Sequence, residues 1–177
     1  MKKFHRGNCF EKLLSDYFLG MPTVIIRRSI LPTNTHDWFY EDFSMIEEAE
    51  LFTRLAFYCK IDYVDDVLAK WRVHGSSLTW TKYEDFAKET KVMLDLFSKK
   101  IPNFNQQFES AIKTKKVWIA RCEAIAFWRK GKGREARSIL WNSSNKSPTL
   151  FILFWLTFFP SPWILPLLYK IRGSVGN

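Results

Sequence analysis

Hydrophobic residues at the start of the chain first follow a helical period and then form a strand-like run. Apolar side chains at positions 10, 13, 14, 17 and 18 lie on one face of a predicted helix, which Gly20-Met21-Pro22 ends. Residues 23–26 are all β-branched and predict a buried strand. Residues 32–45 contain a proline and four aromatic side chains and predict a loop.

The next segment has the order helix, strand, strand. Residues 47–59 return to helical spacing and begin with three glutamates, which suit a helix N-terminus because the helix dipole favours negative charge there. Residues 61–64 and 67–73 predict two short strands joined by Asp65-Asp66. The first half of the chain therefore mixes predicted helices with predicted strands.

From residue 82 onward the pattern is helical. Three candidate helices cover residues 83–100, 104–130 and 134–142. The charge is also unevenly placed, because residues 1–80 carry 10 basic and 11 acidic side chains, whereas residues 81–177 carry 17 basic and 7 acidic ones. A basic half of this kind can bind nucleic acid or an anionic membrane surface, or it can be a solvated helical face.

Residues 147–169 carry no charged side chain, and Pro160, Pro162 and Pro166 interrupt them. A helix that spans a membrane needs about 20 apolar residues, and the prolines argue against one straight span. An interfacial or re-entrant helical hairpin fits this pattern. A pair of helices packed on the rest of the protein and a true span stay open as alternatives.

Composition bounds the class of protein. With 177 residues and 47% hydrophobic side chains, the chain can form a core and is too hydrophobic for a disordered protein. Its three cysteines are widely spaced, so we expect reduced thiols and no structural metal site. No apolar run follows Met1-Lys2-Lys3, so we expect no secretory signal and a cytoplasmic protein. There is no Gly-rich phosphate loop, Gly-x-Ser-x-Gly elbow or His-Glu-x-x-His pair.

One stretch carries a more specific pattern. It begins with Glu47-Glu48-Ala49-Glu50-Leu51-Phe52, continues with Tyr63-Val64, and ends with Leu68-Ala69-Lys70-Trp71-Arg72-Val73-His74. This order of residues resembles the second half of the catalytic domain of family 2 glycosyltransferases. The resemblance is best over residues 8–80 and implies a partial α/β domain, which is half of the nucleotide-diphospho-sugar transferase (GT-A) fold. The implied organisation has three parts. Residues 1–80 are the acceptor-side part of the glycosyltransferase domain, residues 81–146 are a basic helical extension, and residues 147–177 are an apolar tail, for which membrane contact is one interpretation.

The resemblance also implies a site. Glu48, with Glu47 beside it, matches the acidic pair that supplies the catalytic base, which takes the proton of the acceptor hydroxyl. His74 matches a histidine that helps to bind a divalent metal, Mn²⁺ or Mg²⁺, on the donor diphosphate. The substrate-binding residues implied on the acceptor side are Gly20, Thr23, Trp38, Phe39 and Tyr40. For each residue a structural interpretation stands beside this one: helix capping for the glutamates and Gly20, a surface histidine, and packing of the aromatic loop.

The first half of that catalytic domain, which binds the nucleotide and most of the metal, has no counterpart in this sequence. The resemblance therefore implies a fragment of a glycosyltransferase that acts in glycan or cell-surface polysaccharide synthesis. The implied partners are a nucleotide-sugar donor, a glycan or lipid-linked acceptor and the anionic inner face of the cell membrane, but no nucleic acid. We expect inversion if Glu48 acts directly, and we expect the isolated chain to be inactive. The alternative is a non-enzymatic basic helical protein that binds membranes or nucleic acid through residues 82–137, in which changes of Lys113, Lys115, Lys116 and Arg121 would affect binding.

Overall fold

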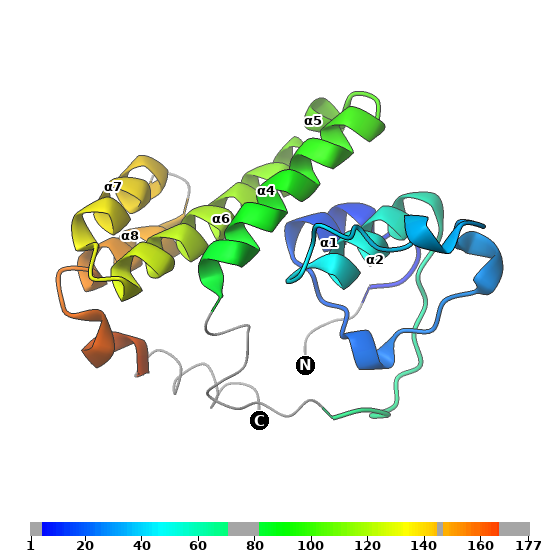
Figure 1. The fold of residues 1–177 in the computed structure, drawn as a ribbon, viewed down its shortest axis with the longest axis horizontal. Coiled ribbons are helices and arrows are strands. Elements are labelled where there is room, and N and C mark those ends of the chain that lie inside the picture. Colours follow the sequence, from blue (N-terminus) through cyan, green and yellow to red (C-terminus); the bar gives the residue numbers. More distant parts are fainter. Residues whose placement is uncertain (1–4, 71–81, 145–146, 167–177) are drawn as a thin grey trace. The chain divides into compact units, whose positions relative to one another are not determined.

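The structure, a computed structural model, describes residues 5–70, 82–144 and 147–166. These residues form helices joined by turns and extended segments (Figure 1). The labelled α-helices are α1 (Phe10–Ser15), α2 (Glu47–Tyr58), α4 (Tyr83–Lys100), α5 (Phe104–Gln107), α6 (Glu109–Arg129), α7 (Gly133–Ser144) and α8 (Pro148–Leu156), and residues 161–166 are also helical. Three single-turn 3-10 helices lie between α1 and α2: η1 (Met21–Thr23), η2 (Arg28–Ile30) and η3 (Thr35–Asp37).

The expected α/β half-domain is wrong. The described part of the chain contains no strand and no sheet, and its one isolated β-bridge pairs Gly7 with Ile61. The predicted strand at residues 23–26 is instead the end of η1 followed by extended backbone, with Ile25 99% exposed. Residues 62–70 form no regular structure, and residues 71–73 of the other predicted strand lie outside the described residues. β-Branched residues favour a strand only where neighbouring strands pair with them.

The helical predictions agree better with the structure. The predicted helix 83–100 coincides with α4, and residues 47–59 form α2 almost to the predicted end. The helix expected over 104–130 is divided at Phe108 into α5 and α6. The first helix ends early, because Asp16 adopts an extended conformation after α1.

The described residues form two compact units. Unit 1 comprises residues 5–70 and 88–115, and unit 2 comprises residues 82–87, 116–144 and 147–166, so that α4 and α6 contribute to both. The division predicted at residues 80 and 146 stays a prediction.

Unit 1 has an aromatic core. Phe10 on α1 lies 4.8 Å from Phe108 and 5.1 Å from Phe57, measured between ring centroids. Phe97 and Phe104 complete the cluster, and both are almost fully buried. Edge-to-face pairs of this kind add to the free energy gained by burying their area. A second cluster lies on α2, where Leu51, Phe52 and Leu55 pack against the segment from Tyr17 to Leu31. These two clusters fix the position of α2.

Unit 2 is built around the pair formed by α7 and α8. Leu140 on α7 and Leu150 on α8 are fully buried, as is Ala136. Two hydrogen bonds fasten the chain that follows α8: the indole Nε1 of Trp128 donates to the carbonyl of Phe159 at 2.9 Å, and Arg137 donates to the carbonyl of Thr157 at 2.9 Å. Among the described helices, none is both long and apolar enough to cross a membrane.

Candidate functional site

The N-terminus of α2 is capped by a residue far away in the sequence. Ile46 occupies the N-cap position and offers no side-chain hydrogen bond. The carboxylate of Glu89 on α4 accepts hydrogen bonds from the backbone N–H groups of Ser44, Met45 and Ile46 at 2.9 to 3.2 Å, and from the hydroxyl of Ser44 at 2.9 Å. Glu89 is only 8% exposed. Its negative charge also interacts favourably with the positive end of the α2 dipole.

Glu89 was missed by the sequence analysis. It lies 43 to 45 residues from its partners, and no local motif marks a glutamate within a long helix as the cap of another helix. The backbone that Glu89 binds leads directly into Glu47 and Glu48. Glu89 therefore fixes the position of the acidic pair.

A buried ion pair within α2 orients an arginine that also binds the loop before the helix. The guanidinium of Arg54 donates to both carboxylate oxygens of Glu50, at 2.7 and 3.0 Å, and the Glu50 side chain is 1% exposed. Arg54 also donates to the carbonyl of Trp38 at 2.8 Å. A bidentate pair of this type fixes direction as well as distance. The hydrogen bond from Arg54 to this carbonyl ties residue 38 to the helix.

Glu47 and Glu48 are partly buried. Burial raises the pKa of the Glu48 carboxyl above its ordinary value, the charge of Glu47 raises it further, and the backbone N–H of Glu48 offsets part of this effect. Burial and then the charge of Glu48 raise the pKa of the Tyr17 hydroxyl. In the described part of the chain, neither the Tyr17 hydroxyl nor the buried oxygen Oε2 of Glu47 has a hydrogen-bond partner.

Gly20 and Thr23 form the turn that follows Tyr17. The hydroxyl of Thr23 donates to the carbonyl of Gly20 at 2.7 Å, and the backbone N–H of Thr23 donates to the same carbonyl at 2.9 Å. Gly20 has an ordinary negative φ of −105°, so backbone conformation does not require glycine at this position. This arrangement supports a structural role in the turn for both residues, and their predicted contact with substrate stays a prediction.

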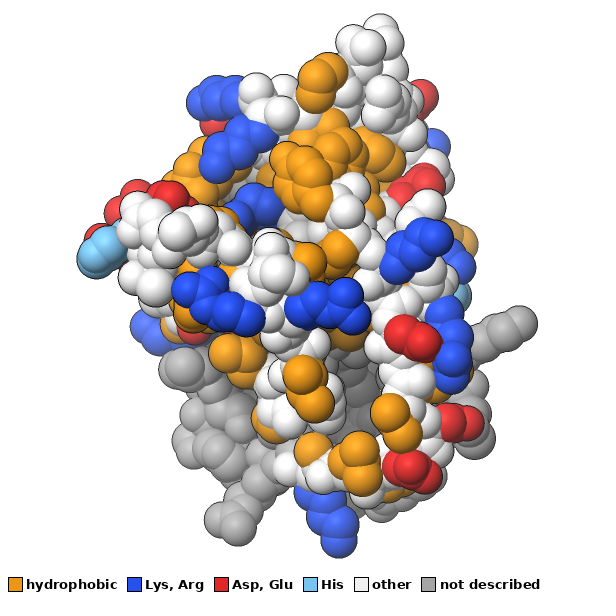
Figure 2. Space-filling view, turned by 90° about the vertical axis from the view of Figure 1, so that its right-hand side faces the viewer, with side chains coloured by type: hydrophobic (Ala, Val, Ile, Leu, Met, Phe, Trp, Pro, Cys, Tyr) orange, Lys and Arg blue, Asp and Glu red, His pale blue; other side chains and the backbone are white. Residues whose placement is uncertain are grey.

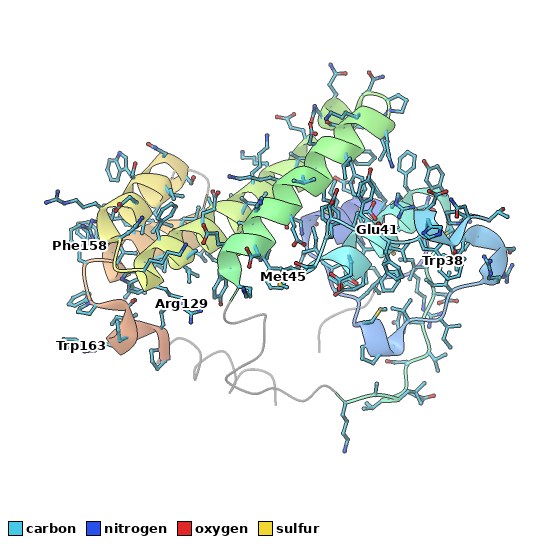
Figure 3. All side chains as sticks on the ribbon, in the orientation of Figure 1. Trp38, Glu41, Met45, Arg129, Phe158 and Trp163 are labelled. Carbon is cyan, nitrogen blue, oxygen red and sulfur yellow. The ribbon has the colours of Figure 1, made fainter. Side chains whose placement is uncertain are left out.

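The aromatic residues 38–40 differ in what they contact; Trp38 is labelled in Figure 3. The indole of Trp38 is half-buried, donates to the carbonyl of Pro32 at 2.9 Å, and has Arg28 over its ring. Tyr40 packs on the ring of Phe43, with centroids 5.5 Å apart. Phe39 is 38% exposed. Of the three predicted sugar-binding side chains, Phe39 is the one whose ring is exposed enough for a ligand to stack on it.

The predicted metal ligand, His74, lies outside the described residues. Among residues 5–70, 82–144 and 147–166, no group of three or more His, Cys, Asp or Glu side chains could hold a metal ion. The described residues alone therefore do not fit a divalent cation. Cys9, Cys59 and Cys122 are not in disulfides, and burial raises the pKa of Cys9 and of Cys59.

The basic residues of the alternative hypothesis do not form one exposed set. Lys113 and Lys116 on α6 are exposed, whereas Lys115 is 8% exposed and interacts with other residues. Arg121 is half-buried, and its Nε atom is buried without a hydrogen-bond partner in the described part of the chain. A nucleic-acid surface needs its cations at the surface, where they meet phosphates.

Comparison with known proteins adds no relative to this picture. No protein-family model, no curated protein and no solved structure matches the chain. The start of α2 is where Glu47 and Glu48 meet Tyr17. The pKa of Glu48 is raised there, and Oε2 of Glu47 and the Tyr17 hydroxyl have no partner among the described residues. Such an arrangement suits proton transfer with a bound hydroxyl.

Proposed function

We propose that this chain takes part in glycosyl transfer, and that the N-terminus of α2 receives a hydroxyl of the sugar acceptor with Glu48 as the general base. The observation that supports this most directly is that two buried polar atoms, Oε2 of Glu47 and the Tyr17 hydroxyl, have no partner among the described residues, while the charge of Glu48 is near enough to raise the pKa of Tyr17. A buried polar group without a hydrogen bond costs about 1–3 kcal/mol. A bound sugar hydroxyl would supply the missing hydrogen bonds.

The raised pKa of Glu48 suits this role. A carboxylate whose pKa is raised by burial binds a proton more strongly than an ordinary one, which suits a general base. In the proposed reaction, the acceptor oxygen bonds to the anomeric carbon of a nucleotide-sugar donor. The bond from that carbon to the diphosphate breaks, and the acceptor proton passes to Glu48. Direct attack of this kind inverts the configuration at the anomeric carbon.

The buried ion pair would shape the same site. Through Arg54 and the carbonyl of Trp38, α2 fixes the start of the aromatic segment 38–40. The partly exposed ring of Phe39 would then offer an apolar face to the acceptor. Correct placement of a reacting group contributes strongly to rate, because a shift of about 1 Å can lower it on the order of 100-fold.

Acceptor binding tests this proposal directly. The methyl glycosides of glucose, galactose and N-acetylglucosamine are added, one at a time, to the isotopically labelled chain while amide and side-chain NMR signals are followed. We expect one of these probes to shift the signals of Tyr17, Glu47 and Glu48, and the variant Glu48→Gln to weaken that binding. An exposed carboxylate on α4, in the variant Asp95→Asn, is the matched control. Signals around α2 that stay unchanged at millimolar concentrations of all three sugars would contradict the proposal.

A further inference from the structure

Unit 2 carries a set of exposed hydrophobic side chains on α8 and on the residues that follow it. We call this set the aromatic surface; it comprises Phe151, Ile152, Trp155, Phe158, Phe159 and Trp163, which are 47% to 74% exposed. Phe158 and Trp163 are labelled in Figure 3 and lie along the same side of unit 2 in that view. Exposed apolar patches of this extent mark an interaction site. Exposed hydrophobic side chains also gather elsewhere, as in the upper part of the face in Figure 2, with basic and acidic side chains around them.

The aromatic surface is preformed by ring contacts. Trp155 stacks on Phe158, with centroids 5.7 Å apart and ring planes at 28°. Phe154 contacts both of these rings, at 5.5 and 5.6 Å. The opposite side of α8 is buried, because Leu150 and Leu153 pack within unit 2. One face of α8 is therefore buried in the core of unit 2, and the other face exposes the aromatic rings.

Basic side chains border the aromatic surface. Residues 129–137 contain five basic residues and one acidic residue. Arg137 lies over the ring of Phe158 at 4.5 Å while it donates to the carbonyl of Thr157. In this geometry a cation lies directly against the aromatic surface. Residues 147–166 themselves contain no charged side chain.

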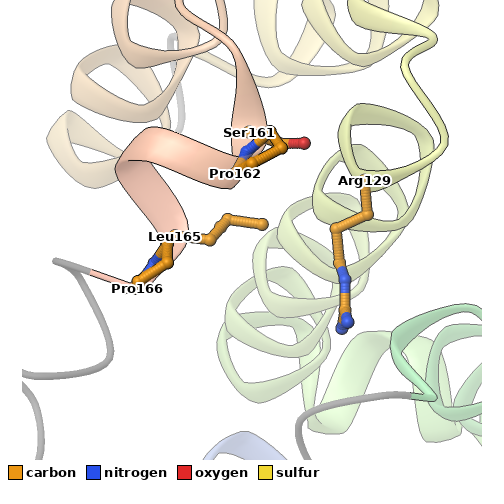
Figure 4. A pocket seen from close by; sticks show the side chains of 5 residues that line it. All are labelled: Arg129, Ser161, Pro162, Leu165 and Pro166. Carbon is orange, nitrogen blue, oxygen red and sulfur yellow. The ribbon is translucent and has the colours of Figure 1, made fainter.

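A small pocket lies at the same border. Arg129 lies opposite Ser161, Pro162, Leu165 and Pro166 around a cavity of about 270 Å³ (Figure 4). This volume is below the range of pockets that bind drug-sized ligands. Because a guanidinium and a hydroxyl are its polar groups, the pocket suits a small anionic group such as a phosphate.

We propose that the aromatic surface binds the face of an anionic lipid bilayer, with the rings at the level of the acyl chains and the basic residues 129–137 at the phosphates. Two observations favour a membrane over a second copy of this chain. In a symmetric dimer through this surface, the basic residues of both copies would approach each other and repel. Tryptophan and phenylalanine beside lysine and arginine form the composition of helices that lie in the membrane interface. The nine residues of α8 are too few to cross a bilayer.

Vesicle sedimentation tests the proposal. The full chain is mixed with vesicles of pure phosphatidylcholine and with vesicles of phosphatidylcholine that contain about 30% phosphatidylglycerol. The bound fraction is measured after centrifugation. We expect at least tenfold stronger partitioning to the anionic vesicles, and a decrease when salt is raised. Failure to bind the anionic vesicles would overturn the proposal.

Two pairs of variants separate the contributions. The double variant Trp155→Gln with Trp163→Gln should weaken binding at least about tenfold, because it removes two inserting rings. Its control is Tyr58→Gln, an aromatic residue of unit 1 that is 75% exposed. The double variant Lys132→Gln with Arg134→Gln should weaken binding about 25-fold, since each basic residue near an anionic surface contributes about fivefold.

A charge-matched control distinguishes a specific surface from general attraction. Lys113→Gln with Lys116→Gln removes the same charge from exposed positions on α6, and we expect it to retain most of the binding. An equal loss in this control and in the variant at 132 and 134 would overturn the proposal in favour of unspecific attraction. Each variant is compared with the wild type by circular dichroism and by sedimentation velocity without vesicles. A dimer that the tryptophan variant dissociates, without vesicle binding by the wild type, would assign the surface to a second copy.

Discussion

Replacement of Glu89 by alanine should destabilise unit 1 more than any other single carboxylate truncation on α4. The change removes the acceptor for three backbone N–H groups at the start of α2. Ser44 is exposed, so water can replace the carboxylate at that residue, whereas Ile46 is 6% exposed and Met45 is half-buried. A buried N–H left without a partner costs about 1–3 kcal/mol. For two such groups, we expect the free energy of unfolding to fall by about 2–6 kcal/mol.

The assay combines urea unfolding, followed by circular dichroism, with hydrogen exchange of the α2 amides. The conservative variant Glu89→Gln keeps one acceptor oxygen and should lose about half as much stability. The control is Asp95→Ala on the same helix, whose exposed pair with Lys99 should contribute below about 0.5 kcal/mol. Surface substitutions usually change the free energy of unfolding by no more than about 0.5 kcal/mol. If the free energies of unfolding of Glu89→Ala and Asp95→Ala differ by less than this, Glu89 does not stabilise the start of α2.

Three further predictions concern the site at α2. The pKa of Glu48 is raised in the folded state, so the folded protein binds more protons than the unfolded one between the two pKa values, and ionised Glu48 lowers stability above that window. Glu48→Gln should therefore raise Tm at pH 7, with a gain that shrinks as the pH falls toward 4. A Tm difference independent of pH would refute this. Tyr17→Phe should leave Tm unchanged or raise it, because it removes a buried hydroxyl without a partner among the described residues, and a clear decrease in calorimetry would reveal a hydrogen bond there. Arg54→Met should cost about 3–5 kcal/mol in urea unfolding, since it leaves the Glu50 carboxylate buried without its partner, and a neutral effect would contradict a buried pair.

Long amphipathic helices were predictable from the sequence, and short β-branched runs were not. The apolar spacing of residues 83–100 depends only on local order, and α4 has those bounds. A strand depends on partners that the local pattern does not contain. Residues 23–26 and 61–64 have strand-like composition, but the only bridge in the described residues joins Ile61 to Gly7. Their exposed side chains, such as Ile25, show that composition alone did not bury them.

The candidate site also has a part that the sequence predicts and a part that it does not. The position of Glu47 and Glu48 at the start of α2 followed from the acidic first turn and the helical spacing, both of which are local. The two residues that complete the arrangement, Tyr17 and Glu89, come from other segments and act through tertiary contacts. Tyr17 was assigned to a helix face, but the chain turns at Asp16 and Tyr17 packs against α2 instead. Only the folded chain brings these groups together.

In the proposed reaction, Glu48 is a partly buried base that receives a proton from a sugar hydroxyl. The most direct measurement is a titration of its side-chain carboxyl by ¹³C NMR, with Glu48→Gln to assign the signal and the urea-unfolded chain as reference. We expect Glu48 in the folded chain to titrate at a higher pH than in the unfolded chain, and the methyl glycoside that shifts the signals around α2 to alter its pKa. A Glu48 carboxyl that titrates at the same pH in the folded and unfolded chain, with or without sugar, would contradict the proposed role.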